Sequence, residues 1–389
     1  MRVVATLEVP VQHETRAHDA RRAPEVIEHG GRLSLVEEPA EQPAGLCVVP
    51  TGTAARRARR GQVIDSAPSR LLASASLPQR LVWVGRVPMR SLFVLSFAIL
   101  AALPPQPRAA SFPRPPELEH QIRCWRSVFT VYSEDQTVIH DTADLDKVYT
   151  VLDFRPYAAA GYTRTEIERI RRDLTDAEIA RIRGLLLRLH STRREALLED
   201  EGRIYDLFRN DRDPNRFLLA AEDGRVRAQR GIMERFTNGL RTSRLYLPEM
   251  ERIFRAEGLP VELTRLPLIE SCFDVGAYSK VGAAGIWQFT PATARLYMEV
   301  NDAVDERRDP IASTYGAARY LTRAYQRLGT WPLAITSYNH GQNGIARAID
   351  EMGTTDIVRI IRYYDGPSFG FASRNFYAEF LAALDIEKH

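Results

Sequence analysis

The chain has 389 residues, which is enough for two or three domains of ordinary size. Its formal net charge of +3 at pH 7 gives no indication of a nucleic-acid partner. Three cysteines without a CxxC pair exclude a disulfide framework, and eight scattered histidines without an HExxH motif predict no metal site. A bridge between Cys124 and Cys272 in an oxidising compartment and two small buried thiols are both compatible with the sequence.

The N-terminal part lacks the pattern of a folded domain. Residues 1–88 are rich in proline, glycine, alanine and arginine and show neither a helical nor a strand period, so we expect disorder. An arginine-rich arm that binds nucleic acid is the less favoured interpretation of the same residues.

A short apolar run begins soon after Met89. Arg90 precedes an apolar stretch at 92–103, and a segment rich in proline and alanine follows, which is the order typical of a secretory signal peptide. These twelve residues are too few to span a bilayer, which needs about 20. We therefore predict that translation starts at Met89, that 1–88 is a mis-called extension and that 89–110 is a signal peptide. The protein is then exported to the periplasm or cell envelope. The alternative is a buried apolar helix within a larger domain.

Residues 111–224 predict a mostly helical accessory region with a few strands. Two pieces, 127–132 and 148–154, have strand-like composition. Apolar residues then recur at helical spacing from about 163 to 198, where Thr175-Asp176-x-Glu178 has the pattern of a capping box. The arginine-rich faces of this stretch are expected to be solvated.

Residues 225–365 predict an all-α domain of short helices, because no alternating strand pattern occurs there. The C-terminal tail, 366–389, is expected to pack on this domain. The expected helix limits are Gly258 after a helix over 247–257, a start near Pro260, starts at Thr290-Pro291 and Asp309-Pro310, an end at Gly329, and a short helix over 331–338.

One carboxylate stands at the end of an apolar helix face. Residues 266–271 are Leu-Pro-Leu-Ile-Glu-Ser, so that Glu270 follows four apolar positions. Desolvation favours the neutral form of a carboxylic acid and raises its pKa. A carboxyl group that is still protonated near neutral pH can protonate a leaving glycosidic oxygen. The alternative is an exposed glutamate at a helix C-terminus.

Two further motifs follow at a specific spacing. Residues 282–291 are Gly-Ala-Ala-Gly-Ile-Trp-Gln-Phe-Thr-Pro, and residues 337–341 are Ser-Tyr-Asn-His-Gly. Closely spaced glycines let the backbone approach a ligand or another element. Trp287 and Phe289 suit either the core or stacking on sugar rings, and Gln288 between them can hydrogen-bond an amide or a hydroxyl.

In this order and spacing, the motifs resemble the soluble lytic transglycosylase family, most closely its membrane-bound lytic transglycosylase D branch. The resemblance covers about residues 226–350, roughly a third of the chain. The residues that carry it are Gly258-Leu259-Pro260-x-Glu262-Leu263, Glu270-Ser271-x-Phe273, Ala277-x-Ser279, Gly282-Ala283-x-Gly285 with the continuation to Arg295, Arg308-Asp309-Pro310 and Ser337-Tyr338-Asn339-x-Gly341.

The resemblance implies an all-α, goose-lysozyme-like catalytic domain with a groove for peptidoglycan glycan strands and no cofactor. It implies Glu270 as a single acid/base catalyst that cleaves the bond between N-acetylmuramic acid and N-acetylglucosamine and leaves a 1,6-anhydromuramic acid end. The implied substrate-binding residues are Ser271, Ser279, Gly285, Gln288, Thr290, Tyr338 and Asn339.

The chain departs from the family pattern at three places. Family members usually have Asn-Pro at Asp274-Val275, methionine at Thr290 and alanine at Ser337, which concerns subsite preference more than the reaction. No LysM repeat is found, so attachment to the wall is expected from the catalytic domain, the accessory region or a cell-envelope partner protein. The competing interpretations are a hydrolytic muramidase of goose-lysozyme type and a non-catalytic wall-binding protein.

Overall fold

A computed structural model describes residues 112–388 of the chain. The predictions for 1–88 and 89–110 therefore lie outside the described residues. Among the described residues, no helix combines the length and the apolar character that a membrane crossing requires.

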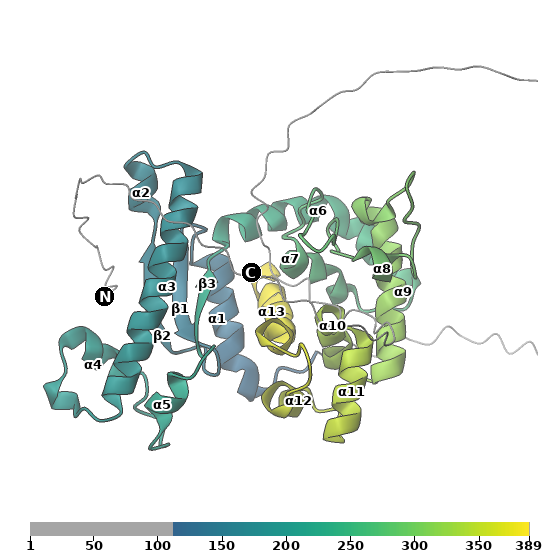
Figure 1. Cartoon of the computed structure of the whole chain (residues 1–389). Helices are drawn as coiled ribbons and strands as arrows, with labels where there is room; N and C mark the ends of the chain where they lie inside the picture. The colour runs from purple at the N-terminus through teal and green to yellow at the C-terminus, as the bar shows by residue number, and fades with distance from the viewer. Residues whose placement is uncertain (1–111, 389) are drawn as a thin grey trace, which may run out of the picture. The chain divides into compact units, whose positions relative to one another are not determined.

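A small antiparallel sheet organises the first part of the described chain (Figure 1). Its strands are β1 (Gln136–Asp141), β2 (Val148–Asp153) and β3 (Val226–Arg230), in the order β2-β1-β3. The central residue Val138 pairs with Val151 on one side and with Gln229 on the other. Successive side chains of β1 point to opposite faces, as strand geometry requires. Ile139 accordingly packs in an apolar cluster with α3, while the ring of His140 lies beside that of Phe371.

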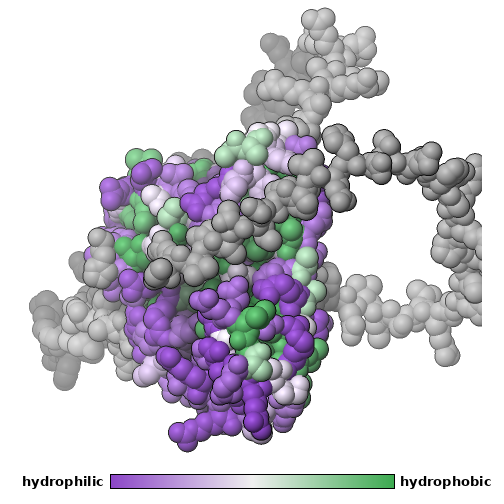
Figure 2. All heavy atoms as spheres, turned by 90° about the vertical axis from the view of Figure 1, so that its left-hand side faces the viewer, coloured by the Kyte–Doolittle hydropathy of each residue, from purple (hydrophilic) through white to green (hydrophobic). Residues whose placement is uncertain are grey.

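Short helices and one long helix surround this sheet. Helix α3 (Arg164–Leu189) places Ile182, Leu185, Leu186 and Leu189 in the cluster that contains Ile139. The smaller elements are η1 (Pro116–Leu118), α2 (Arg155–Ala159), η2 (Arg194–Ala196), α4 (Glu199–Asp206) and α5 (Arg216–Ala220). The side of the molecule seen in Figure 2 is largely hydrophilic, with smaller hydrophobic patches. Exposed ion pairs such as Arg181–Glu178 on α3 agree with the expected solvated arginine faces. Arg171 of the same helix is an exception, since it is buried and donates to the Thr137 hydroxyl.

Three local predictions in this part are wrong. Residues 127–132 are not a strand: 119–130 form helix α1 (Glu119–Thr130), because Ile122, Trp125 and Phe129 bury one helical face. The capping box lies at Thr163 and Glu166, not at Thr175. The helix begins at residue 164 and continues without a break through Thr175, which therefore lies inside it. The helical stretch also ends at Leu189 instead of 198. The strand predicted at 148–154 is confirmed as β2.

The region from residue 225 onward is helical apart from its first residues. The expectation of no strand there is wrong for β3, whose sequence Val-Arg-Ala-Gln-Arg has little apolar alternation and is selected by pairing with β1. The helices that follow are α6 (Met233–Ala256), η3 (Val261–Arg265), α7 (Leu266–Glu270), α8 (Pro291–Ala294), η4 (Glu306–Arg308), α9 (Pro310–Leu328), α10 (Trp331–His340), α11 (Gln342–Met352), α12 (Ile357–Tyr363) and α13 (Phe371–Glu387).

Most of the expected helix limits are confirmed. The Asp309 carboxylate accepts the backbone N–H groups of Ile311 and Ala312 at the start of α9, and Gly329 ends that helix with a φ of 82°. Thr290 caps α8 in the same way. The helix expected over 247–257 is the second half of α6, which begins fourteen residues earlier, at Met233.

Helix α13 is a core element of the helical domain. Figure 1 shows it between α1 and α10, and both of these helices pack against it. Eleven of its 17 residues are buried. The indole N–H of Trp125 on α1 donates to the Oδ1 of Asn375 over 3.1 Å. Helices α1 and α13 therefore share one apolar core, against which Cys124 packs. Cys124 and the buried Cys272 are not bonded to each other.

This central position predicts a large effect of truncating α13. Replacing Phe380, which is fully buried, by alanine should lower the free energy of unfolding by about 3–5 kcal/mol, because it leaves a cavity in the core. Urea unfolding followed by circular dichroism measures this loss. Leu245→Ala on α6, where the side chain is 76% exposed, is the control and should change stability by less than about 0.5 kcal/mol. Equal effects of the two substitutions would contradict the core role of α13.

Candidate active site

The candidate acid is the last residue of a buried helix. All five residues of α7, Glu270 included, are buried, and the Glu270 side chain is 5% exposed. Pro267 suits the first turn, where its missing N–H leaves no unmade helical bond. Helix α7 packs between α6 and α13, so its apolar residues are enclosed from both sides. The carboxyl group of Glu270 is therefore held in a largely apolar environment.

Tyr338 on α10 lies near this carboxyl group. Burial raises the pKa of the Tyr338 phenol well above its ordinary value of 10, and the negative charge of Glu270 raises it further. The phenol donates a hydrogen bond to the carbonyl oxygen of Trp287 over 2.9 Å. Tyr338 is thus a neutral donor near physiological pH, hydrogen-bonded to the segment that contains Trp287.

That segment is a loop, residues 274–290, which we call the wall loop. Isolated bridges join Tyr278 to Ala284 and Ala284 to Phe289, so the loop folds back on itself without a regular strand. Gly285 has a φ of +71°, and a Cβ there would overlap the carbonyl oxygen of Arg307. The glycine at this position is required for both reasons. The side-chain amide of Gln288 donates to the Gly285 carbonyl oxygen over 2.8 Å, which folds Gln288 onto its own loop.

Ser271 connects the wall loop to the glutamate. Its hydroxyl donates to the carbonyl oxygen of Ile286 over 2.9 Å. The chain then turns sharply, since Cys272 and Phe273 have φ values of 53° and 52°. Left-handed backbone at two successive non-glycine residues is strained and persists only where the surroundings enforce it. Here Gly239 of α6 lets the turn approach, because a Cβ on Gly239 would lie 2.6 Å from the Cys272 carbonyl oxygen.

The aromatic residues of the wall loop belong to the core. Trp287 is fully buried, stacks on Phe254 and donates its indole N–H to the Thr314 hydroxyl over 2.9 Å. Phe289 is 3% exposed and packs edge to face against Tyr338. Of the two roles that the sequence allows, stacking on sugars or core packing, both residues therefore have the second.

Arg307 also holds the wall loop, through carbonyl groups other than those that Ser271 and Tyr338 bind. Its guanidinium donates through Nη1 to the carbonyl oxygens of Gly282 and Phe289, over 2.7 and 3.1 Å. The Nε and Nη2 groups each donate to the Asp305 carboxylate over 2.8 Å. Arg307 is 5% exposed, so this charge is buried and paired.

The remaining predicted residues have local partners. Ser279 accepts the backbone N–H of Ala283 at the base of the wall loop. Thr290 caps α8. The Oδ1 of Asn339 accepts the Ser373 hydroxyl of α13 over 2.9 Å, while its buried Nδ2 has no partner among the described residues. The structure thus joins Ser271 and Tyr338 to the loop that contains Gly285 and Gln288, and the Asn339 oxygen is bound to α13.

Two contributors were missed by the sequence interpretation. Arg307 directly precedes the Arg-Asp-Pro motif, and its pairing with Asp305, two residues away, is the only local signal for it. Thr314 lies on α9, and nothing in the sequence connects it to Trp287, because the contact joins residues 27 positions apart.

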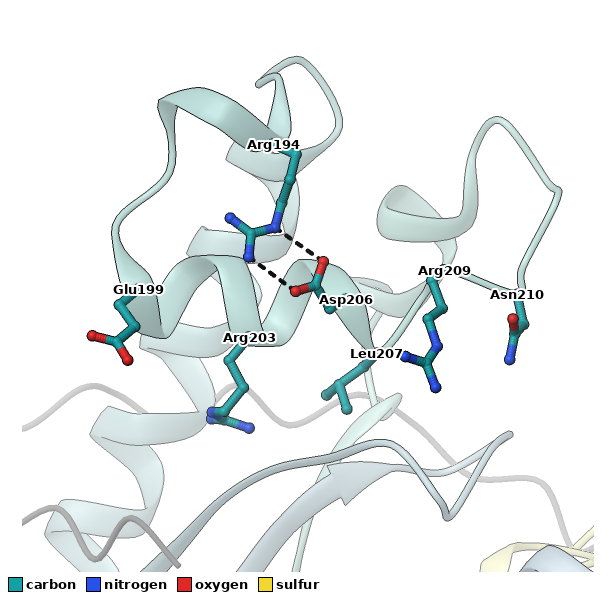
Figure 3. Close-up of a pocket in the computed structure, with 7 residues that line it drawn as sticks. All are labelled: Arg194, Glu199, Arg203, Asp206, Leu207, Arg209 and Asn210. Atoms are coloured by element: carbon teal, nitrogen blue, oxygen red, sulfur yellow. Dashed lines mark hydrogen bonds and ion pairs between the residues drawn. The ribbon is translucent and has the colours of Figure 1, made fainter. Parts of the chain in front are cut away.

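A cavity of about 510 Å³ lies elsewhere, beside α4 (Figure 3). Arg194 points into it and forms a double hydrogen bond with Asp206, and Arg203 and Arg209 also line it. Arg194 and Asp206 therefore neutralise each other within this cavity. Among residues 112–388, no group of three or more histidine, cysteine or acidic side chains could hold a metal ion.

Residues 251–361 match the family model described as Transglycosylase SLT domain. This range includes Glu270 and the residues that bind the wall loop, namely Ser271, Arg307 and Tyr338. This chain contains a Transglycosylase SLT domain. The predicted resemblance is confirmed, and with it the all-α, lysozyme-like fold of the catalytic domain after a mostly helical region with a few strands.

Two relatives match the chain over a limited stretch. The chain is 39% identical over 97 residues to membrane-bound lytic murein transglycosylase D of Escherichia coli (strain K12), and the match covers 24% of this chain and 22% of that protein. A protein of Alteromonas sp. (strain M-1) named for tributyltin chloride resistance is 40% identical over 96 residues, covering 24% of this chain and 46% of that protein. The chain therefore spans between about a fifth and about a half of these relatives.

The packing of Gly285 generates a first prediction for the SLT domain. Gly285→Ala should lower the free energy of unfolding by about 3 kcal/mol, because left-handed backbone strain and the overlap with the Arg307 carbonyl add up. Gly329→Ala is the matched control: Gly329 has a similar φ of +82° but open space around it, so it should lose only about 1–2 kcal/mol. Urea unfolding of both proteins gives the comparison, and equal losses would refute the close contact.

The Asp305–Arg307 pair generates a prediction about pH. Hydrogen bonds from Arg307 hold the pKa of Asp305 below its ordinary value of 3.8. The unfolded chain thus binds more protons in that range, so the pair stabilises the fold fully above pH 3.8 and less as the pH falls through the lowered pKa. Asp305→Asn should cost about 1–2 kcal/mol at neutral pH and clearly less near pH 3. The exposed Asp302→Asn is the control, and a pH-independent difference for Asp305→Asn would contradict the pairing.

Proposed function

We propose that this protein is a peptidoglycan lytic transglycosylase that cleaves the β-1,4 bond between N-acetylmuramic acid and N-acetylglucosamine. Glu270 acts first as acid and then as base. The observation that supports this most is a buried carboxyl group beside a neutral tyrosine, inside a Transglycosylase SLT domain. The relative in E. coli is named a lytic murein transglycosylase.

In the first step, Glu270 donates its proton to the glycosidic oxygen as the bond from that oxygen to C1 of the muramic acid breaks. The apolar end of α7 favours the neutral carboxylic acid before the reaction, because burial disfavours the charged form. The N-acetyl group of the muramic acid assists as an internal nucleophile. Positioned acid catalysis of this kind contributes about 10²–10⁴ in rate.

In the second step, ionised Glu270 removes the proton of the 6-hydroxyl group, and that oxygen bonds to C1 as the bond from the acetyl oxygen to C1 breaks and the N-acetyl group is restored. A 1,6-anhydro ring forms, no water is consumed, and Glu270 returns to its protonated form. Most glycosidases use a pair of carboxylates about 5–9.5 Å apart. An internal hydroxyl as nucleophile removes the need for the second carboxylate, so one buried glutamate suffices.

The surrounding residues are proposed to hold the glycan strand. Backbone groups at Gly285 and side chains of Ser271, Ser279, Gln288 and Thr290 would form one wall, with Tyr338 and the unpartnered Nδ2 of Asn339 on the α10 side. Positioning of a bound strand supplies much of the rate that acid–base help does not. We propose that the protein acts in the cell envelope, where this substrate lies.

The competing enzyme function is a hydrolytic muramidase, which would use the same glutamate and a water molecule. The products separate the two. Transglycosylation leaves 1,6-anhydromuramic acid ends, whereas hydrolysis leaves reducing muramic acid ends. Mass spectrometry of soluble fragments from purified sacculi gives this answer, and exclusively reducing ends would reject the lytic transglycosylase proposal.

The role of Glu270 is tested by Glu270→Gln. This substitution keeps the size of the side chain but removes the transferable proton, so release of anhydro-muropeptides should fall by about 10²–10⁴ while the fold and sacculus binding remain. Glu257→Gln, at an exposed residue after α6, is the matched control and should behave as the wild type. Near wild-type release by Glu270→Gln would disprove the assignment.

A further inference from the structure

The wall loop has no helix or strand of its own, so its shape depends on backbone hydrogen bonds within the loop and on the side chains that bind its carbonyl groups. Five of its carbonyl oxygens accept hydrogen bonds from side chains. Ser271 and Tyr338 bind those of Ile286 and Trp287. The amide of Gln288 binds that of Gly285 from within the loop. Arg307 binds the remaining two, at Gly282 and Phe289.

These contacts come from two parts of the chain. Ser271 directly follows Glu270 in the chain, and Tyr338 lies on α10, where burial and then the charge of Glu270 raise its pKa; we call these two residues the glutamate side. Arg307 belongs to η4, which the chain reaches only after α8. The carbonyl oxygen of Arg307 lies where a Cβ on Gly285 would stand, and the guanidinium of Arg307 binds the carbonyl oxygens of Gly282 and Phe289. The loop is therefore hydrogen-bonded both to the glutamate side, at Ile286 and Trp287, and to Arg307, at Gly282 and Phe289.

Burying an arginine side chain is often less favourable in free energy than filling the same space with an apolar side chain. Burying a charge carries a desolvation penalty, and an apolar side chain of similar volume is often as stable or more so. What the guanidinium adds is geometry, because its five N–H groups lie in one rigid plane. With Asp305 fixing that plane through two hydrogen bonds, the remaining donors define where Gly282 and Phe289 lie.

We propose that Arg307 is a positioning residue for the reaction, which holds the wall loop so that Ser271 and Tyr338 orient Glu270 toward the bound glycan. The inference rests on the proposed function. Arg307 acts through the loop and touches neither the reacting atoms nor the strand. Its loss should therefore lower turnover more than it weakens substrate binding.

The experiment compares Arg307→Met with the wild type on purified glycan strands, at a temperature well below the melting temperature of each protein. We expect kcat to fall at least tenfold and KM to change less than threefold. Arg307→Lys should recover only part of the activity, because one ammonium group cannot bridge Asp305 and two carbonyl oxygens. Arg359→Met, at an exposed arginine of α12, is the control and should leave both constants unchanged.

A double-mutant cycle with Tyr338→Phe separates positioning from mere stability. If Arg307 acts through the Tyr338–Trp287 hydrogen bond, the combined loss in kcat is smaller than the product of the two single losses. Independent losses, or a wild-type kcat for folded Arg307→Met, would overturn the inference. If Arg307→Met does not fold, Arg307→Lys and Asp305→Asn take its place in the same cycle. Wild-type protein that releases no anhydro-muropeptides would instead reject the proposed function.

Discussion

Enclosure of one carboxyl group is the constraint on which the rest of the structure depends. Helix α7 is only five residues long and buries all of them, so it has no stability of its own and exists because α6 and α13 enclose it. Helix α13 covers this segment, and it lies in the same core that encloses Glu270. An SLT domain without α13 would leave one side of this segment open to solvent.

The wall loop shows a second consequence of that constraint. A regular strand beside Glu270 would pair its backbone with a neighbouring strand and leave fewer backbone groups to meet a ligand. The loop instead satisfies its carbonyl groups partly with its own backbone N–H groups and partly with the side chains of Ser271, Arg307 and Tyr338, as buried polar groups require. Strained residues, among them Gln288 with a φ of 50°, are held in place by these contacts. Such strain commonly accompanies functional sites, where the surroundings over-determine the backbone.

The region before the SLT domain contributes to the same core. Trp125 and Phe129 of α1 pack with Phe236 of α6 and Phe371 of α13, so the sheet and the helical domain are joined through an apolar interface. The guanidinium carbon of Arg227 on β3 also lies over the ring of Phe371, 4.4 Å from the ring centroid. The accessory region therefore supports the helix that encloses Glu270, which gives it a structural role whatever else it binds.

The sequence by itself determined the features that depend on neighbouring residues. Caps at Asp309 and Thr290, the end of α9 at Gly329 and the apolar helix before Glu270 follow from local chemistry, because the interacting groups are within four residues of each other. The order of the glutamate, glycine-rich and tyrosine motifs was sufficient to recognise the family. Only the tertiary structure decided that Trp287 and Phe289 belong to the core and that β3 pairs with β1. The same holds for the helix over 119–130 and for the hydrogen bonds from Arg307 to the wall loop. Each of these depends on partners that lie far away in the chain or on burial that no local pattern specifies, and folding alone brings such partners together.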